Sequence, residues 1–297
     1  PLRNEFDEVF DDTTMGQESF EQAESALLKN AVIRALTKAN KSAADVDFIM
    51  TGDLLNQCTG SCFALKDLEI AFIGMYGACS TMALTLCNSA MLIDAGAHCC
   101  VAGASSHFAS SERQFRYPLE YGGQRPPTSQ WTVTGAGAAV VVKNGNGPKI
   151  KAIHIGTITD LGIKDANNMA AAKTISDFLD DTQTAADDYD LILTGDLGYT
   201  GSTLLHEVLA LEYHKNIKSV HNDCGLMIYD LKEQDVNSGG SGCGCSASVL
   251  CSHIMNKIND GKYNRVLFVA TGALMSPTSA KQGQPIPGIA HAVLIEN

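Results

Sequence analysis

The sequence is poor in the features that mark several classes of protein. No apolar run approaches the roughly 18 residues that a membrane-spanning helix needs, so we expect no transmembrane segment. The basic residues are scattered and the formal net charge is −12, which argues against nucleic acid and against unaided adsorption to anionic lipid. With only 8 prolines and 6% aromatic residues, the core must consist mostly of aliphatic side chains, alanine and glycine.

Paired cysteine motifs are also missing, although the chain has 10 cysteines. The spacings of Cys58 with Cys62 and of Cys243 with Cys245 do not match a zinc site or a disulfide framework. Other cysteines, such as Cys87 and Cys99, stand among apolar or small residues. We therefore predict free core thiols, a reducing compartment and no metal site.

Four segments of the first half recur in the second half in the same order. Thr51-Gly52-Asp53 returns as Thr194-Gly195-Asp196, each time after a short apolar run. The other pairs join residues 77–96 with 242–261, 99–106 with 266–276, and 133–144 with 286–297. Collinear repeats indicate an internal duplication. A turn-rich joint near 144–151 predicts halves at 1–148 and 149–297, and the start at Pro1 without Met predicts that an N-terminal piece is missing.

Each half alternates between helical and strand patterns. We predict helices at 18–39, 79–95, 170–180 and 246–259, and strands at 46–50, 70–76, 99–102, 138–142, 191–193, 266–270 and 292–295. Ser80 or Thr81 is a candidate N-cap of the second helix, and Gly96 is its candidate C-terminal stop. The continuous apolar strands indicate sheets covered on both faces, and therefore a layered α/β fold.

A cysteine stands where one central helix begins, in Gly77-Ala78-Cys79-Ser80. The positive end of the helix dipole is expected to lower the pKa of the Cys79 thiol and favour a thiolate. The backbone N–H groups there can also hold a carboxylate or an oxyanion. A small buried thiol that merely fits the site is an equally good interpretation.

This motif in a duplicated α/β chain resembles the thiolase and ketoacyl-synthase superfamily. The resemblance implies a five-layered αβαβα fold with two pseudo-symmetric halves, the first of which lacks the family's first strand or two. It also places Cys79 on the nucleophile position. Ketosynthase-III-like members also carry a His and an Asn in the second half, but here the matching segments are 194–198 and 240–246, without either residue. Since these partners supply the proton shuttle and part of the oxyanion stabilisation, their absence argues against an enzyme. His206, His214 and His221 lie off the motif, and we expect them to be surface or hydrogen-bonded side chains.

Longer motifs resemble the stage V sporulation protein AD family of endospore-forming bacteria. They are residues 112–124 (ERQFRYPLEYGGQ), 130–137 (QWTVTGAG), 52–57 and 239–247. The resemblance implies a non-catalytic protein that binds dipicolinic acid, alone or as its calcium chelate, during uptake into the developing spore. It also implies membrane-protein partners from the same operon, a cytoplasmic or peripheral position on the inner membrane of the forespore, a homodimer and no cofactor.

A flat ligand with two carboxylates needs a narrow slot with donors at its ends. The N-terminus of the Cys79 helix offers N–H groups, and Ser80 offers a hydroxyl. Pseudo-twofold symmetry places two strand-end loops beside that helix start. The candidate binding residues are therefore Cys79, Ser80, Ser105, Ser106, His107, Ala273 and Leu274. Ordinary loop capping remains an equal alternative for Ser105 and Ser106.

Two further sets of residues each have two possible roles. Arg113, Arg116 and Arg125 are candidate partners for the carboxylates, with Tyr117 and Tyr121 as flat neighbours, but this segment serves equally well as a dimer interface. Asp53 and Asp196 end equivalent strands, where calcium binding competes with the commoner capping of N–H groups. At the level of function, an acyltransferase or condensing enzyme using Cys79, or a scaffold with a vestigial site, competes with the binding protein.

Overall fold

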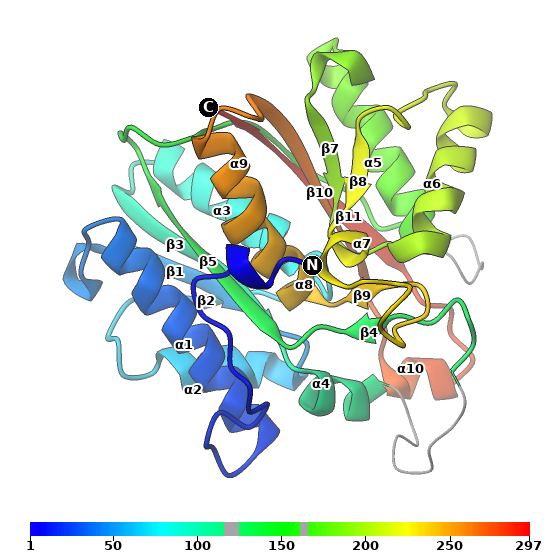
Figure 1. The fold of residues 1–297 in the computed structure, drawn as a ribbon. Coiled ribbons are helices and arrows are strands. Elements are labelled where there is room, and N and C mark those ends of the chain that lie inside the picture. The colour runs from blue at the N-terminus through cyan, green and yellow to red at the C-terminus, as the bar shows by residue number, and fades with distance from the viewer. Residues whose placement is uncertain (116–124, 161–165) are drawn as a thin grey trace.

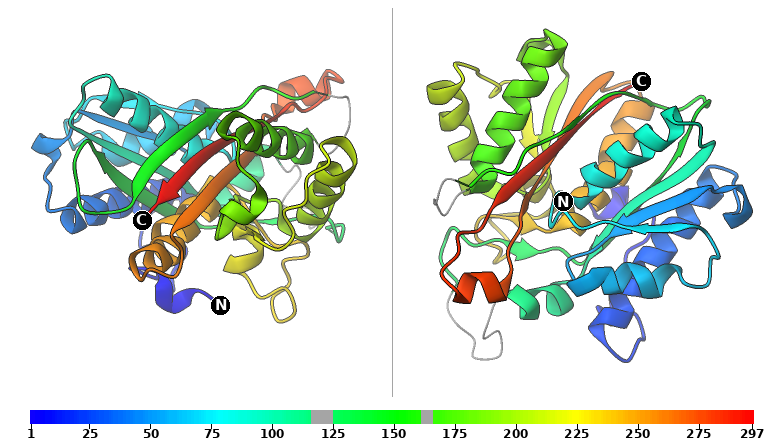
Figure 2. Two further views of the ribbon diagram at one scale, coloured as in Figure 1. Left: turned by 90° about the horizontal axis from the view of Figure 1, so that it is seen from above. Right: turned by 180° about the vertical axis from the view of Figure 1, so that it is seen from behind.

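Two β-sheets alternate with three layers of helices in the computed structural model, which describes residues 1–115, 125–160 and 166–297 (Figure 1). Helices α1 (Phe20–Lys38) and α2 (Thr59–Leu65) cover the outer face of the first sheet. Helices α5 (Ala166–Thr182) and α6 (Gly198–Glu212) form the layer outside the second sheet. The remaining long helices lie between the sheets (Figure 2), which gives the predicted five-layered α/β fold.

The first sheet has the strand order β2-β1-β3-β5. Its members are β1 (Phe48–Gly52), β2 (Phe72–Gly74), β3 (Cys99–Ser106) and β5 (Gly135–Val142). Strand β1 pairs in parallel with β2 and β3, whereas β5 runs antiparallel to β3. The carboxyl ends of β1, β2 and β3 therefore meet at one edge of the sheet.

The second sheet has the order β6-β11-β10-β7-β8. Its members are β6 (Lys149–Ile155), β7 (Leu191–Thr194), β8 (His221–Asp223), β10 (Arg265–Ala273) and β11 (Gly288–Glu296). Strands β8, β7, β10 and β11 repeat the order and directions of β2, β1, β3 and β5. The duplicated architecture is thus confirmed, while β6 has no counterpart among the described residues of the first sheet.

The central layer is formed by two helical segments that lie between the sheets. Helix α3 (Thr81–Asp94) contacts β1 and β3 on one side and β10 and β11 on the other. Gly96 stands two residues after its last residue, as the predicted stop, and has a φ of +117°, a conformation that glycine tolerates best. The other segment starts three residues before the predicted helix and consists of α8 (Cys243–Val249), a π-helical turn (Leu250–Ile254) and α9 (Met255–Asn259).

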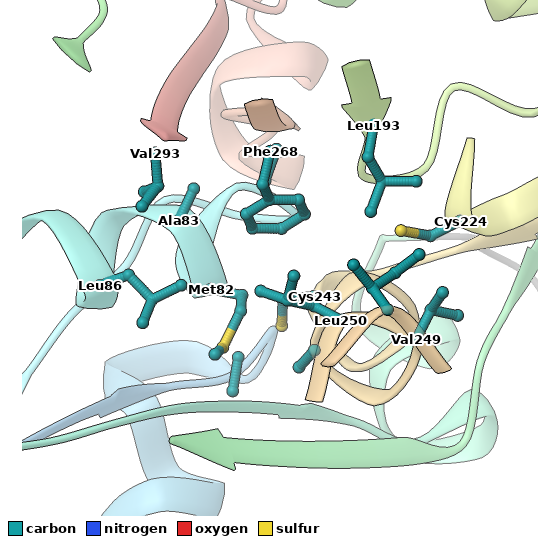
Figure 3. Close-up of a cluster of buried hydrophobic side chains, with 14 of the residues drawn as sticks. Met82, Ala83, Leu86, Leu193, Cys224, Cys243, Val249, Leu250, Phe268 and Val293 are labelled. Atoms are coloured by element: carbon teal, nitrogen blue, oxygen red, sulfur yellow. The ribbon is translucent and has the colours of Figure 1, made fainter. Parts of the chain in front are cut away.

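The main core lies where this layer meets the second sheet (Figure 3). Met82 and Leu86 of α3 pack with Leu250 of the π-helical turn and Phe268 of β10, and all four are buried. Burial of each such side chain contributes about 1.5–3 kcal/mol. All ten cysteines are free thiols, as predicted, and seven of them are buried.

The sequence pattern does not predict α2, α6, β6 or β8, nor the short elements that complete the chain. These short elements are α4 (Phe108–Phe115), β4 (Trp131–Thr132), α7 (Cys224–Ile228), β9 (Gly240–Ser241), α10 (Pro277–Lys281) and 3₁₀ turns at Arg3–Glu5, Ala43–Asp45, Asn56–Cys58 and Ala186–Asp188. Strands β4 and β9 pair in parallel and so connect the two halves. None of the helices in the described ranges is long and apolar enough to cross a membrane.

Candidate functional site

Cys79 lies in a tight turn between β2 and α3, at the start of the central layer. Ala78 has a φ of +50°, a left-handed conformation that is unfavourable for a residue with a Cβ. Ser80 occupies the N-cap position of α3, as predicted. Its hydroxyl does not cap the helix, however, but donates to the carbonyl oxygen of Gly77 at 2.6 Å. The turn therefore presents the Cys79 side chain, which is only partly buried, towards the second half.

Polar groups of the second half lie close to Cys79. The Oγ of Ser241 in β9 lies 4.0 Å from the Cys79 Sγ. Ser241 in turn donates to the Oδ2 of Asp196 at 3.1 Å, and the N–H of Gly242 donates to the same oxygen at 2.8 Å. Thr271 donates to the Oδ1 of Asp196 at 3.2 Å. The site is thus a thiol, a hydroxyl and a buried carboxyl group.

The expectation of a Cys79 thiolate is wrong. Burial raises the pKa of the Cys79 thiol well above its usual value, and the neighbouring Asp196 carboxyl raises it further. Burial also raises the pKa of Asp196, while the hydrogen bonds that this carboxyl accepts favour its ionised form. A negative group next to a thiol disfavours a second negative charge, and here burial and this charge together exceed the effect of the dipole of α3. Cys79 is therefore a neutral thiol at physiological pH.

His206 and His221 form hydrogen bonds with residues other than Cys79. His221 Nε2 lies 2.9 Å from the Thr194 hydroxyl, and His221 Nδ1 lies 2.9 Å from His206 Nε2. Burial lowers the pKa of His221 to about 3, which keeps this imidazole neutral. His214 is exposed. All three are thus surface or hydrogen-bonded side chains, as expected.

The three polar candidates at the end of β3 are buried and engaged in contacts within the protein. Ser105 donates to Glu24 of α1 at 3.3 Å. Ser106 donates to the carbonyl oxygen of Val133 at 2.6 Å and accepts the N–H of Gly244 at 3.1 Å. His107 Nε2 lies 2.8 Å from the carbonyl oxygen of Thr13. These contacts join α1, β3 and the start of α8, and none of them involves Cys79.

The end of β10 does flank the start of α3, as pseudo-symmetry predicted. A Cβ on Gly272 would lie 2.1 Å from the carbonyl oxygen of Gly77, so only glycine permits this approach. Ala273 and Leu274 follow directly and are partly buried. Of the predicted binding residues, the structure therefore brings Cys79, Ser80 and the β10 end together.

The two candidate arginines within the described residues bind acidic side chains of the protein. Arg113 forms an ion pair with Glu21 of α1. Arg125 forms an ion pair with the buried Glu112 at 2.9 Å, and its guanidinium lies 4.4 Å from the centre of the Trp131 ring. The predicted candidates Arg116, Tyr117 and Tyr121 lie outside the described residues.

Both aspartates of the repeated motif cap N–H groups, as the commoner alternative predicted. Asp53 accepts the N–H groups of Leu55 at 2.9 Å and Ser61 at 2.7 Å, and Asp196 accepts that of Gly242. Within residues 1–115, 125–160 and 166–297, no group of three or more His, Cys, Asp or Glu side chains is placed to hold a metal ion.

Two site residues carry no motif signal in the sequence. In the sequence, Ser241 is one residue of the segment that lacks the family asparagine, and Thr271 is one residue of a strand-end loop. Neither residue is singled out by a motif of its own. Their roles follow from the pairing of β9 with β4 and from the position of β10 beside β7, which bring both residues to Asp196. The spacing of the repeat predicts the strand ends but not which side chain turns towards Cys79.

Solved structures with this arrangement of layers define the class of fold. AbyA1, a tetronic acid condensing enzyme, has a TM-score of 0.61 at 17% identity and covers 92% of this chain and 86% of its own. The 3-oxoacyl-[acyl-carrier-protein] synthase III of Aquifex aeolicus VF5 has a TM-score of 0.60 at 14% identity, with 95% and 85% covered. At such identities the likeness shows the fold, which is thiolase-like.

Sequence similarity identifies the family within that class. The family model of stage V sporulation protein AD matches residues 1–296. Stage V sporulation protein AD of Bacillus subtilis (strain 168) is 45% identical over 303 residues, which cover 100% of this chain and 89% of the relative. The chain belongs to the stage V sporulation protein AD family.

Proposed function

We propose that this protein binds dipicolinic acid without catalysis and acts in its uptake into the developing spore. The observation that carries the proposal is the contact of Cys79 with Ser241, which donates to the neighbouring Asp196 carboxyl. The neighbouring carboxyl group raises the pKa of the thiol and so disfavours the reactive thiolate. Membership of a sporulation family supports a role of the retained site in that process.

The ligand would lie at the start of α3. Cys79 and Ser80 stand at the N-terminal end of this helix, whose N–H groups attract carboxylates. Ala273 and Leu274 would supply an apolar wall, because they follow the close contact of Gly272 with Gly77. Ser105, Ser106 and His107 would act indirectly: their hydrogen bonds would hold β3 against α1 and α8 and so stabilise the site.

The protein would work as a homodimer beside membrane proteins of the same operon, on the forespore inner membrane. Strand β2 is an edge of the first sheet and is exposed along its whole length. Phe72 and Ile73 of this strand are each 38% exposed. An unpaired edge with apolar side chains favours pairing with the same edge of a second copy.

One observation favours a second candidate function, an acyltransferase or condensing enzyme of the ketoacyl-synthase III type with Cys79 as nucleophile. The left-handed Ala78 holds a thiol at the start of a central helix, and strained turns are common at catalytic residues. Acylation of Cys79 followed by turnover would support this function.

Calorimetric titration with dipicolinate, with and without calcium, tests the leading proposal. We expect saturable binding by the wild type, loss of binding in Cys79→Phe and Cys79→Met, and retention in Cys79→Ala. The matched control is Cys62→Phe, which changes an exposed cysteine of α2. Circular dichroism checks that each variant is folded.

The same proteins are then incubated with an acyl-coenzyme A and analysed by mass spectrometry. Covalent acylation of Cys79 with release of product would contradict the binding proposal. Absence of both dipicolinate binding and acylation would contradict both functions and leave a scaffold.

A further inference from the structure

The side chain of Gln130 contacts both second-half segments that form the Cys79 site. Its Nε2 lies 2.6 Å from the carbonyl oxygen of Asp196 and 2.8 Å from that of Gly240, the residue before Ser241. An amide nitrogen has two hydrogens, so Gln130 donates to both carbonyls at once. One side chain of the first half thus fixes the backbone of both partners of Cys79.

A buried ion pair holds Gln130 in this place. Arg125 donates to the carbonyl oxygen of Gln130 at 3.1 Å and pairs with Glu112. Glu112 also accepts the N–H and the hydroxyl of Thr132, at 3.3 and 3.0 Å. Since β4 lies between these contacts and pairs with β9, the whole segment is anchored beside Ser241.

The opposite side of the Asp196 loop is held by another carboxyl group. Asp223 accepts the N–H of Leu197 at 2.9 Å and that of Gly198 at 2.9 Å. The backbone next to Asp196 is therefore fixed through its own carbonyl by Gln130 and through the following N–H groups by Asp223. Of these two anchors, Gln130 is the one that belongs to the first half.

We propose that Gln130 is a positioning residue that sets Asp196 and Ser241 against the Cys79 thiol and so couples residues 125–134 to the site. The positioning itself is independent of what the site binds, whereas its effect on dipicolinate affinity rests on the proposed function. Loss of the two donors would free the Asp196 loop and move its carboxyl group away from the thiol.

The test measures the rate of Cys79 alkylation by iodoacetamide against pH, read for each cysteine by peptide mass spectrometry. Gln130→Met keeps the length and neutral charge of the side chain but removes both donors. We expect the pH profile of Cys79 to move to lower pH. At any pH below the thiol pKa, alkylation should be about tenfold faster for each pH unit by which the profile moves.

Two controls separate positioning from general loss of stability. Gln284→Met makes the same change at an exposed position and should leave the profile of Cys79 unchanged. Ile175→Val weakens the buried core of α5, away from the site, and should lower the melting temperature without moving the profile.

A Cys79 profile in Gln130→Met equal to that of the wild type, or displaced no further than in Ile175→Val, would overturn the proposal. Dipicolinate titration of the same variants gives a separate result. If the wild type does not bind dipicolinate but Gln130→Met displaces the Cys79 profile, the proposed function fails and the positioning role holds.

Discussion

The Cys79 thiol has two electrostatic neighbours with opposite effects. The N-terminal end of α3 favours a thiolate, and the Asp196 carboxyl opposes it. Because Asp196 is buried, its interaction is screened less by solvent than that of a surface charge. Burial and this charge together exceed the effect of the helix dipole, so the thiolate form of Cys79 is disfavoured.

Asp196→Asn should lower the pKa of the Cys79 thiol, because it removes the negative charge that opposes ionisation. We expect Cys79 to be alkylated at least about tenfold faster at pH 8, for a fall of one pKa unit. Site-resolved mass spectrometry measures the rate. Asp187→Asn, at an exposed position, is the control and should leave the rate unchanged. An unchanged rate in Asp196→Asn would show that burial alone holds the thiol neutral.

Glu24 is a second buried acid at the residue scale, in contact with Ser105 and Ser110. Burial, and then the nearby Asp53, raise the pKa of Glu24 to about 8. The folded state keeps the proton while the unfolded chain releases it near its usual pKa of about 4.3. This group therefore stabilises the fold less and less as pH rises from about 4.3 to about 8.

Glu24→Gln should remove that loss, since a neutral amide has no proton to release. The gain in unfolding free energy over the wild type should grow with pH and reach on the order of 3 kcal/mol near pH 7. Urea unfolding at several pH values between 5 and 8 measures it. Glu18→Gln, an exposed change just before α1, is the matched control for the substitution itself. A constant difference for Glu24→Gln would contradict the assignment of a buried, protonated Glu24.

At the scale of elements, the central layer depends on close backbone approaches to its neighbours. A Cβ on Gly137 of β5 would lie 2.2 Å from the carbonyl oxygen of Ala247 in α8. A Cβ on Gly272 of β10 would meet Gly77 before α3 in the same way. Small residues at these points let each helix lie directly on its sheet, because protein interiors have little free volume.

Gly137→Ala should destabilise the protein by roughly 1–3 kcal/mol, because the added methyl group forces β5 and α8 apart. Thermal and urea unfolding measure the change. Gly147→Ala is the matched control, since a Cβ there meets nothing within 4 Å, and it should change stability by no more than about 0.5 kcal/mol. Equal stability of the two variants would mean that β5 and α8 can separate without cost.

At the scale of the whole molecule, duplication gives two sheets with one strand order and a shared central layer. The two halves contribute differently to the site. The first provides the Cys79 turn and the Gln130 segment, and the second provides Asp196 and Ser241. The site exists only where the halves meet, so their mutual packing is part of its construction.

The proposed dimer is the property of the whole molecule that can be tested most directly. Ile73→Lys should convert a dimer to a monomer, because a lysine on an edge strand opposes edge-to-edge pairing. Light scattering coupled to size-exclusion chromatography measures the mass. Ile158→Lys makes the same change at a residue that is 62% exposed elsewhere, and it should leave the mass unchanged. A monomeric wild type at micromolar concentration would contradict the dimer.

Periodicity and repetition in the sequence predict many of the helices and strands that make up the layers, but not α2, α6, β6 or β8. The long helix α1 and the strands β1, β3, β7, β10 and β11 carry enough apolar residues for their pattern to be read locally. The short elements β4, β9 and α7 are too short to show such a pattern. Two-residue strands have no periodicity, and they form only because distant segments are brought together.

Local patterns in the chain indicate the duplication, a layered α/β fold and the thiol at the start of α3. The family resemblance adds the thiolase-like layers and the lack of His and Asn at the motif positions. All of this can be read from the sequence because repeats, periodic apolar residues and motifs are properties of short segments. Only the folded arrangement places Asp196 and Ser241 beside Cys79 and keeps the thiol neutral. It also forms the two hydrogen bonds from Gln130 to the backbone of Asp196 and Gly240. These features depend on burial and on contacts between residues up to 162 positions apart, which no local pattern records.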